Sequence, residues 1–580
     1  MAEIKEISQI TTLPGVKRDG TNLDGDNFVD AQWTRFMRGR PKKMGGYAEV
    51  VSPVPGPIRA SLLWSRGDFN GLVSGSLFGI TQANIDSNGG AGTSYDRTPV
   101  GWVVGEGAWT LDTMYDDAVG SQNTIIVAHR NNAGSKIDDP NASQVYFGVA
   151  NYTTAFLPIT GLTVSGGVCC IAPYLVYYGS DGLVGWSDVN QPQTLTTGDA
   201  GQDRITGAKV VKGLPFRSGS GPACVLWSLD SVIRMDYVGG NAIFRFSTVT
   251  NQSSIMSQNS VIEYDGDYFW VGIDRFLVYT GGKVVEIPNQ MNKNWFFDNV
   301  NYNQRQKIWV TKVPRYGEII WFFPSGESEE CDTAIVFNIN EKTWYDFSLS
   351  RTAGYYSQVF NHPVWAGEGS EQLLRITLDT PTGSFQAGDT ITGNTTNDNA
   401  VVNNVESSTS IVVRPTSISG DRATLFQYGE TISNLSRAGT GVVALLTPLN
   451  SHYIHEKGKN AVFANREVAI TSWFETSDFG YPTGGATQNN IKGLNRYTRL
   501  VRIEPDFRMV GNMSVEVIGR EFAQSPDTVS APFTFGADTG KIDLREQRRQ
   551  IRLRFQSNEL NGDFEMGRTI LHTEPGDVRS

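Results

Sequence analysis

Metal or acid–base chemistry in this sequence would have to come from few side chains. The chain has 580 residues but only five histidines and four cysteines. His452 and His455 stand three residues apart beside Glu456, a spacing that could hold a metal on one face of a helix. The flanking residues show no helical periodicity and indicate a domain junction. We therefore predict no metal site and no cofactor here.

Motifs for nucleophilic catalysis or phosphate binding are also missing from the sequence. No GxSxG, Walker, HExxH or EF-hand spacing occurs. A glycosidase needs only two carboxylates about 5–10 Å apart, and Asp265, Asp267 and Asp274 are candidates for such a pair. All three stand in turn sequences, where aspartates bond backbone amides. We predict no catalytic residues and no enzymatic activity.

The four cysteines lie at Cys169, Cys170, Cys224 and Cys331, without the spacing of a metal site. We expect buried thiols in a reducing compartment. The first residues show no basic start followed by an apolar run, and no stretch of about 18 apolar residues occurs. We therefore expect synthesis in a cytoplasm, without a signal peptide and without stable membrane insertion.

Composition predicts the fold class. The net charge is −11 and 19% of residues are charged, which argues against a protein that coats nucleic acid electrostatically. The 62 glycines and 11% aromatic residues favour short strands separated by frequent turns. We predict a mainly β protein: a β-propeller with an inserted small β-domain and a C-terminal β-sandwich-like platform.

Residues 51–371 are predicted to form the propeller blades. Val261–Val271 forms a hairpin that turns on Asp265-Gly266, and Phe276–Ile287 forms another that turns on Gly281-Gly282. Ala334–Tyr345 is a third strand–turn–strand unit. Trp227 and Trp270 lie 43 residues apart, each before a Tyr-x-Gly-Gly turn, and a recurrence of 40–50 residues is typical of blades.

Residues 372–448 are predicted to form the inserted module. Phe385–Thr392 recurs as Phe426–Ser433 with an offset of 41 residues, and Ala400–Val402 recurs as Gly441–Val443 with the same offset. Two copies of a small β-unit indicate a compact accessory domain.

Residues 449–580 are predicted to form the platform, and residues 1–50 an extended arm. In the platform, Ile551–Phe555 alternates apolar and basic side chains, as in a half-buried strand.

Two local concentrations of positive charge stand out in this acidic chain. The first, from Arg35 to Lys43, is either a solvated loop or a docking surface. The second, from Lys541 to Arg554, is either a charge-protected edge strand or a surface that faces a partner. The residues that we predict at partner or subunit interfaces are Arg35, Arg38, Arg40, Lys42, Lys43, Arg545, Arg548, Arg549, Arg552 and Arg554.

Three segments together resemble the tail nozzle proteins of short-tailed bacteriophages, also called tail tubular protein B or packaged-DNA stabilisation proteins. They are the arm that ends in Arg-Gly-Arg-Pro-Lys-Lys-Met-Gly-Gly-Tyr at 38–47, the hairpins of 264–282, and the tail of 555–577 with Gly-Asp-Phe-Glu-Met-Gly and Pro-Gly-Asp. The resemblance covers most of the chain except the insert.

The resemblance implies a virion protein of the viral tail. It implies a homohexameric ring below the adaptor and portal proteins, which continues the DNA channel, retains the packaged genome and holds tail fibres or spikes. Double-stranded DNA would pass through the lumen without sequence recognition. No single functional residue can be carried over, because the family works through ring geometry. The alternative is a propeller-type tail protein that binds or cleaves glycans.

Overall fold

The computed structural model describes most of the chain. The described residues are 6–21, 26–50, 54–66, 69–85, 91–102, 107–118, 124–132, 143–150, 154–216, 221–357, 360, 362–367, 373–416, 426–434, 436–463, 466–480, 496–522 and 524–578. They form a mainly β protein, and the one α-helix among them is α1 (Lys293–Asn299). Short 3₁₀ turns lie at Ser180–Gly182, Gly240–Ala242, Tyr302–Lys307 and Pro314–Tyr316. No helix in the described part is long and apolar enough to cross a bilayer.

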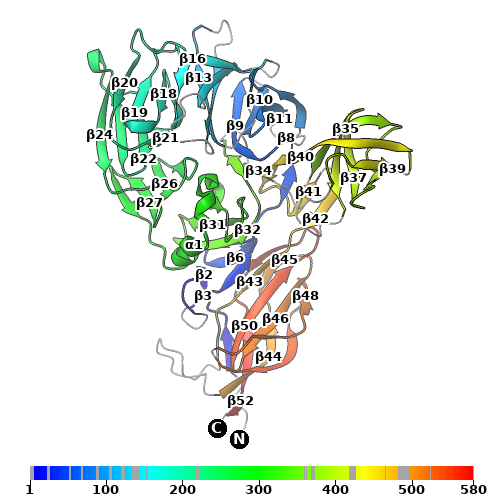
Figure 1. Cartoon of the computed structure of the whole chain (residues 1–580). Coiled ribbons are helices and arrows are strands. Elements are labelled where there is room, and N and C mark those ends of the chain that lie inside the picture. The colour runs from blue at the N-terminus through cyan, green and yellow to red at the C-terminus, as the bar shows by residue number, and fades with distance from the viewer. Residues whose placement is uncertain are drawn as a thin grey trace.

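Figure 1 shows three parts, which we call the ring, the insert and the C-terminal body. The ring contains six four-stranded antiparallel sheets, each made of four consecutive strands. The first sheet contains β9 (Ile58–Arg66), β10 (Phe69–Ser76), β11 (Gly79–Ile85) and β12 (Ala91–Asp96), and the second contains β13 (Gly107–Tyr115), β14 (Thr124–Asn132), β15 (Gln144–Val149) and β16 (Leu157–Thr163). The third sheet contains β17 (Gly167–Ile171), β18 (Tyr174–Tyr178), β19 (Leu183–Trp186) and β20 (Gly201–Arg204), and the fourth contains β21 (Val210–Pro215), β22 (Ala223–Ser228), β23 (Val232–Tyr237) and β24 (Phe244–Thr250). The fifth sheet contains β25 (Val261–Tyr264), β26 (Asp267–Val271), β27 (Phe276–Thr280) and β28 (Lys283–Glu286), and the sixth contains β29 (Trp309–Val313), β30 (Glu318–Phe323), β31 (Thr333–Asn338) and β32 (Thr343–Ser348).

A seventh group of strands closes the ring. It contains β33 (Ala353–Tyr355), β34 (Val364–Gly367), the end of β40 (Gly439–His455) and β7 (Tyr47–Glu49), paired in that order. β33 contacts both β29 and β9, so this group lies between the sixth sheet and the first. Two of its strands come from outside residues 51–371. Further strands extend it or pair with β40, namely β41 (Asn460–Phe463), β42 (Arg466–Ala469) and β8 (Val54–Pro55).

The expected hairpins of the ring are confirmed. Tyr264 pairs with Asp267 across the turn, and both Asp265 (φ 51°) and Gly266 (φ 88°) have the positive φ that a two-residue turn of this kind requires. The Gly281-Gly282 turn joins β27 to β28 in the same way. Strands β31 and β32 form the third expected unit.

The recurring tryptophans pack between neighbouring sheets. Trp227 lies on β22 and Trp270 on β26, each the second strand of its sheet, and their rings meet edge to face at 5.7 Å. Trp321 lies on β30, which is likewise the second strand of its sheet. All three are fully buried. Each sheet thus covers its apolar face with the face of the next, so the apolar core of the ring is divided into layers.

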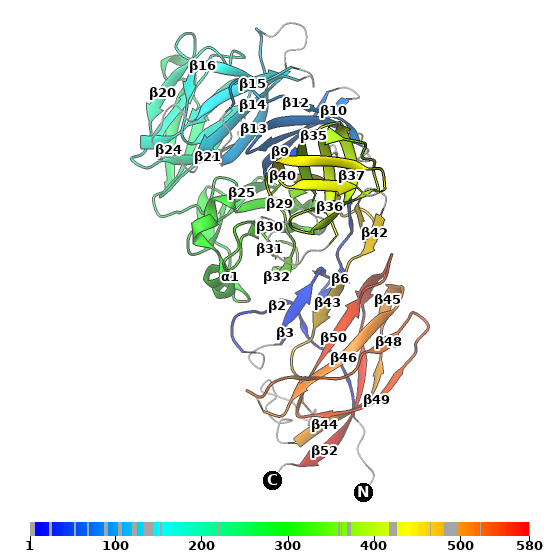
Figure 2. The same cartoon turned by 45° about the vertical axis from the view of Figure 1, so that its right-hand side comes forward.

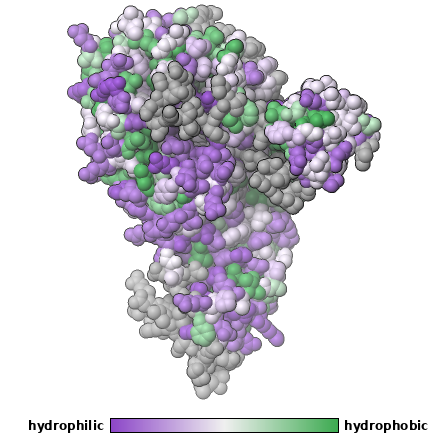
Figure 3. All heavy atoms as spheres, viewed as in Figure 1, coloured by the Kyte–Doolittle hydropathy of each residue, from purple (hydrophilic) through white to green (hydrophobic). Residues whose placement is uncertain are grey.

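The insert is a six-stranded antiparallel sheet that closes on itself. Its strands are β35 (Leu374–Thr382), β38 (Ser410–Pro415), β37 (Asn399–Ser407), β36 (Thr390–Gly393), β39 (Thr431–Asn434) and the first part of β40, which pairs back with β35. Ten buried apolar side chains fill its interior. In Figure 3 the insert stands out from the side of the ring.

The two sequence copies are related by approximate two-fold symmetry. β36 of the first copy pairs antiparallel with β39 of the second. Asp389 accepts a hydrogen bond from the N–H of Gln386, and Glu430, 41 residues later, accepts the equivalent bond from the N–H of Gln427. Because the same turn is built twice, the sequence repeat corresponds to a structural repeat.

The C-terminal body contains three four- to six-stranded sheets and a two-stranded pair. Its strands are β1 (Glu6–Gln9), β52 (Ile570–Val578), β44 (Arg496–Glu504) and β49 (Ile542–Arg548); β4 (Asp30–Gln32), β43 (Ser472–Glu475), β50 (Gln550–Ser557), β46 (Met513–Arg520), β47 (Thr528–Val529) and β48 (Phe533–Phe535); β45 (Phe507–Val510), β51 (Asp563–Met566), β6 (Arg40–Lys43) and β5 (Thr34–Met37); and β2 (Leu13–Val16) with β3 (Asn27–Phe28).

The N-terminal segment joins these parts. It is extended as expected, but its described strands are paired into sheets. β1 pairs with β52 at the end of the body remote from the ring, and β7 pairs into the ring itself (Figures 1 and 2). One apolar core includes residues of this segment, of the sixth ring sheet and of the C-terminal body. The ring and the body are therefore one continuous packed structure.

Candidate functional site

The first predicted interface residue, Arg35, is buried inside the chain. Only 1% of its side chain is exposed. Its Nε donates to Glu318 Oε1 of the ring at 2.9 Å, and its Nη1 donates to Glu456 Oε2 at 2.8 Å. The guanidinium also stacks on the ring of Tyr316. Burial opposes the charge on Glu456, but the two contacts with Arg35 outweigh it and lower the pKa of Glu456. Arg35 therefore serves a contact within this chain.

The rest of the first basic segment has mixed surroundings. Arg38 is exposed and Arg40 is half-buried, and the N–H groups of the Arg38-Gly39 turn donate to Glu341 of the ring. Lys42 forms an ion pair with Glu565 at 3.2 Å. Lys43 is buried, and its Nζ has no hydrogen-bond partner. Of this segment, the surface available to a partner is centred on Arg38 and Arg40.

The structure divides the second basic segment between two sheets. Arg545 and Arg548 lie on β49, whereas Arg552 and Arg554 lie on β50 of a different sheet, with Arg549 between the strands. The run therefore does not form one surface.

The members of the second segment also differ in exposure. Arg545 is exposed, and Arg548 and Arg549 are half-buried. Arg552 is buried and donates to Glu475 at 2.8 Å, and Arg554 binds the same carboxylate. The apolar face that the sequence predicted for β50 is confirmed, because Ile551, Leu553 and Phe555 are fully buried, but the strand is not half-buried as expected, because Arg552 on the other face is buried too.

His452 and His455 lie on β40, a strand, and not on a helix. A separation of three residues on a strand turns the two side chains to opposite faces. The ring of His452 bonds Ser61 and Ser74 at 3.1 and 2.9 Å, whereas that of His455 accepts from Arg351 Nε at 3.0 Å. Burial lowers the pKa of His452 to about 3. Both imidazoles are therefore neutral groups of the core, and the described residues contain no cluster of three possible metal ligands.

Of the three carboxylates considered for glycoside hydrolysis, Asp265 and Asp274 lie in surface turns as expected, whereas Asp267 is the first residue of strand β26. Asp265 has the positive φ of the β25–β26 turn, and Asp274 forms an exposed ion pair with Arg275. Neither lines the cavity described next.

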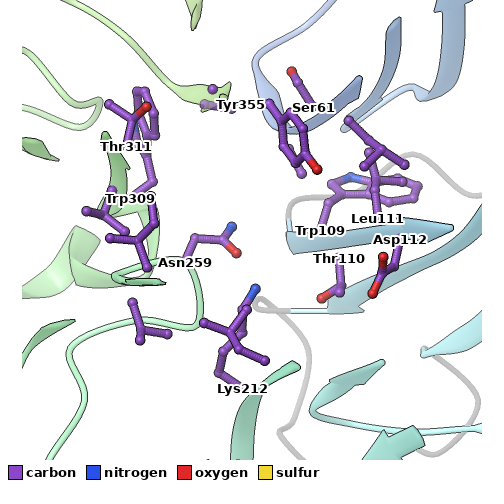
Figure 4. Close-up of a pocket in the computed structure, with 18 of the residues that line it drawn as sticks. Ser61, Trp109, Thr110, Leu111, Asp112, Lys212, Asn259, Trp309, Thr311 and Tyr355 are labelled. Atoms are coloured by element: carbon purple, nitrogen blue, oxygen red, sulfur yellow. The ribbon is translucent and has the colours of Figure 1, made fainter. Parts of the chain in front are cut away.

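A cavity of about 370 Å³ lies at the centre of the ring (Figure 4). The first strand of every sheet in the ring contributes to its wall, and so does β33. The segment Gln258-Asn259 crosses this centre: Gln258 Nε2 donates to Thr110 Oγ1 at 2.9 Å, and Asn259 Nδ2 reaches the carbonyl of Arg59 at 3.4 Å. The cavity is therefore a product of ring closure.

Three cationic side chains line the cavity. Arg59 forms an ion pair with Glu330 at 2.6 Å, and Lys312 forms one with Glu263 at 3.1 Å. For Lys212 no described residue lies within ion-pair or hydrogen-bond distance of the amine, which points into the cavity (Figure 4). Burial lowers the pKa of Lys212.

The half-buried carboxylate of Asp112 lies on the same cavity wall. Its two oxygens accept the N–H groups of Thr113 and Cys170, each at 2.8 Å. Burial raises the pKa of Asp112, although these two N–H groups and the charge of Lys212 oppose the rise. Cys169, like the other three cysteines, is a buried free thiol, and burial raises its pKa.

Sequence reasoning missed Asp112 and Lys212. The two residues are 100 positions apart in the sequence, and each is a single charged residue in a strand that matches no motif. Only closure of the ring brings them to one cavity. A charged residue within an otherwise apolar, inward-facing strand was the available signal.

Comparison with known proteins adds no relative: no protein-family model matches the chain, and no curated protein matches its sequence.

Proposed function

We propose that this chain is a structural virion protein, the tail nozzle of a short-tailed bacteriophage. In this proposal its seven groups of strands are the blades of a β-propeller, the insert is an accessory domain, and the C-terminal body is the platform. Copies of the chain, six by resemblance, assemble into a ring below the adaptor. That ring continues the DNA channel, retains the packaged genome and carries fibres or spikes.

The observation that carries the proposal is the continuous packing between ring and C-terminal body. Strands of residues 27–49 pair into both parts, and buried Arg35 binds Glu318 and Glu456 between them. Arg18 adds a second tie through Asp30 and Asp346. A wall that must resist the pressure of packaged DNA needs such continuity, whereas an enzyme that closes over a substrate needs a hinge.

The size of the central cavity supports a channel between copies. A volume of about 370 Å³ equals that of a sphere about 9 Å across. The proposal therefore places the DNA channel between copies and not at the centre of one chain. In the proposal, the acidic surfaces of several copies surround the duplex and do not bind its phosphates.

Imaging of the purified protein by electron microscopy tests this proposal. We expect closed rings with a central opening wide enough for a DNA duplex. Single particles that stay monomeric at micromolar concentration would contradict it.

The alternative is a glycan-cleaving propeller, which the two cavity carboxylates Asp112 and Glu263 favour. Both carboxylates already have partners within the chain. Asp112 accepts hydrogen bonds from two backbone N–H groups, and Glu263 forms an ion pair with Lys312 and accepts from the N–H of Gly266. Hydrolysis of a glycan that Asp112→Asn abolishes, in a variant that still folds, would establish the alternative.

A further inference from the structure

The unpaired amine of Lys212 indicates a binding site for an anionic ligand at the centre of the ring. Arg59 and Lys312, the other cations of the cavity, have carboxylate partners. Lys212 has neither a hydrogen bond nor an ion pair with any described residue, although it stands on β21 deep in the ring. The side chain of Lys212 is half-buried in the cavity wall. A partly desolvated ammonium without a hydrogen bond or ion pair is unfavourable, and an anionic ligand would reduce that cost.

Asp112 does not take the place of such a ligand. Both of its oxygens face backbone N–H groups, from Thr113 and Cys170, and neither oxygen lies within 4 Å of the Lys212 amine. The ammonium therefore keeps its three N–H donors for another group.

Neutral polar groups that face the same space indicate a ligand with hydroxyl groups. The hydroxyl of Tyr355 and the side-chain carbonyl of Asn259 point into the cavity (Figure 4), and no described residue bonds either of them. Burial raises the pKa of Tyr355 to about 12, so its hydroxyl remains a donor at neutral pH. A donor and an acceptor beside a cation suit a hydroxylated anion.

The volume and the walls limit the size of the ligand. Small-molecule sites usually measure about 300–1,000 Å³ and have mainly apolar and aromatic walls. This cavity, at about 370 Å³, lies at the small end of that range, and Trp109 and Trp309 belong to its wall. Its volume suits a ligand of the size of one sugar ring.

We propose that the cavity at the centre of the ring binds one small sugar acid, with Lys212 as the counter-ion of its carboxylate and Tyr355 and Asn259 as partners of its hydroxyl groups. The site is separate from the proposed role of the chain as a tail component, and neither depends on the other.

Titration calorimetry on the full chain tests this site with glucuronate, galacturonate and gluconate as probes. Glucose lacks the carboxylate and inorganic phosphate lacks the sugar, so these two compounds are the controls. We expect saturable binding of at least one sugar acid at one site per chain, and no saturable binding of glucose or of phosphate. Lack of binding by all three acids, or binding of phosphate alone, would overturn the proposal.

Substitution of Lys212 locates the site. Lys212→Met should weaken binding of the sugar acid about 10- to 100-fold, because it removes a charge-assisted contact. Tyr355→Phe should weaken it less, by about 2- to 10-fold, because it removes a neutral hydrogen bond. Lys283→Met, at the exposed first position of β28, is the matched control and should bind like the parent protein.

Thermal unfolding without ligand shows whether each variant is folded. Since the amine of half-buried Lys212 has no hydrogen bond or ion pair with a described residue, Lys212→Met should unfold no earlier than the parent protein. Unweakened binding by a folded Lys212→Met variant would place the ligand elsewhere and overturn the proposal.

Discussion

Arg35 belongs to a basic segment that suggested a partner surface, but its guanidinium forms ion pairs in the interior of the chain. Its two carboxylate partners lie 283 and 421 residues away along the chain. Local charge counting cannot detect such partners, because only the folded chain brings them together. For this reason the sequence predicted a basic surface where the structure has a buried ionic cluster.

Loss of the Arg35 side chain should be strongly destabilising. Arg35→Met would leave Glu318 and Glu456 close together without a cation, and breaking a buried pair in this way costs about 3–5 kcal/mol. Arg38→Met, on an exposed neighbour, should change the free energy of unfolding by less than about 0.5 kcal/mol. Unfolding in urea measures both. Equal effects of the two variants would mean that the cluster contributes nothing to stability.

Lys43 predicts a dependence of stability on pH. Burial lowers its pKa from 10.5 to about 8, and the charge of Asp563 only partly opposes this. The unfolded chain therefore binds more protons than the folded one between pH 8 and 10.5, and the contribution of Lys43 to stability rises with pH across that window. Below pH 8 the folded protein carries an unpaired buried ammonium.

Replacement of Lys43 by methionine should remove this pH-dependent contribution to the free energy of unfolding. At pH 7, Lys43→Met is expected to raise the free energy of unfolding by about 1–3 kcal/mol, because a buried charged group without partners is unfavourable. This gain should shrink as the pH rises from 8 to 10.5. Lys42→Met, next along the chain but paired with Glu565, is the control and should show no such trend. A gain that is independent of pH would contradict the account.

At the scale of elements, local turn chemistry made much of the fold predictable. The Asp265-Gly266 and Gly281-Gly282 hairpins, the 41-residue repeat and the apolar face of β50 all follow from neighbouring residues. The group of strands that closes the ring was not predictable in this way. It unites Tyr47–Glu49 with Tyr453–His455, about 400 positions later, and no local pattern specifies that pairing.

The insert should be removable without loss of the remaining fold. The N–H of Leu449 donates to the carbonyl of Leu373 at 2.9 Å, so the chain enters and leaves the insert at adjacent points. Replacing residues 374–448 by Asn-Gly should leave a folded, soluble protein, because the insert has its own closed core.

Circular dichroism and thermal unfolding would test the deletion. We expect a strand-rich spectrum and a cooperative transition within a few degrees of that of the parent protein. Aggregation, or loss of the transition, would show that the insert is part of the folding unit of the ring.

At the scale of the whole molecule, the N-terminal segment determines how the parts are joined. Its strands pair with the last strand of the C-terminal body, with two inner sheets of that body and with the closing strands of the ring. The chain thus folds as one continuous wall. The cavity at the centre of the ring is small, and our account places the DNA channel between copies.

The number of chains in the purified particle tests this account most directly. Native mass spectrometry of the full chain at low micromolar concentration should show a closed assembly of several copies, six by resemblance, of the 63.7 kDa subunit. A particle that remains a single subunit over the whole concentration range, and that cleaves a glycan, would contradict the account.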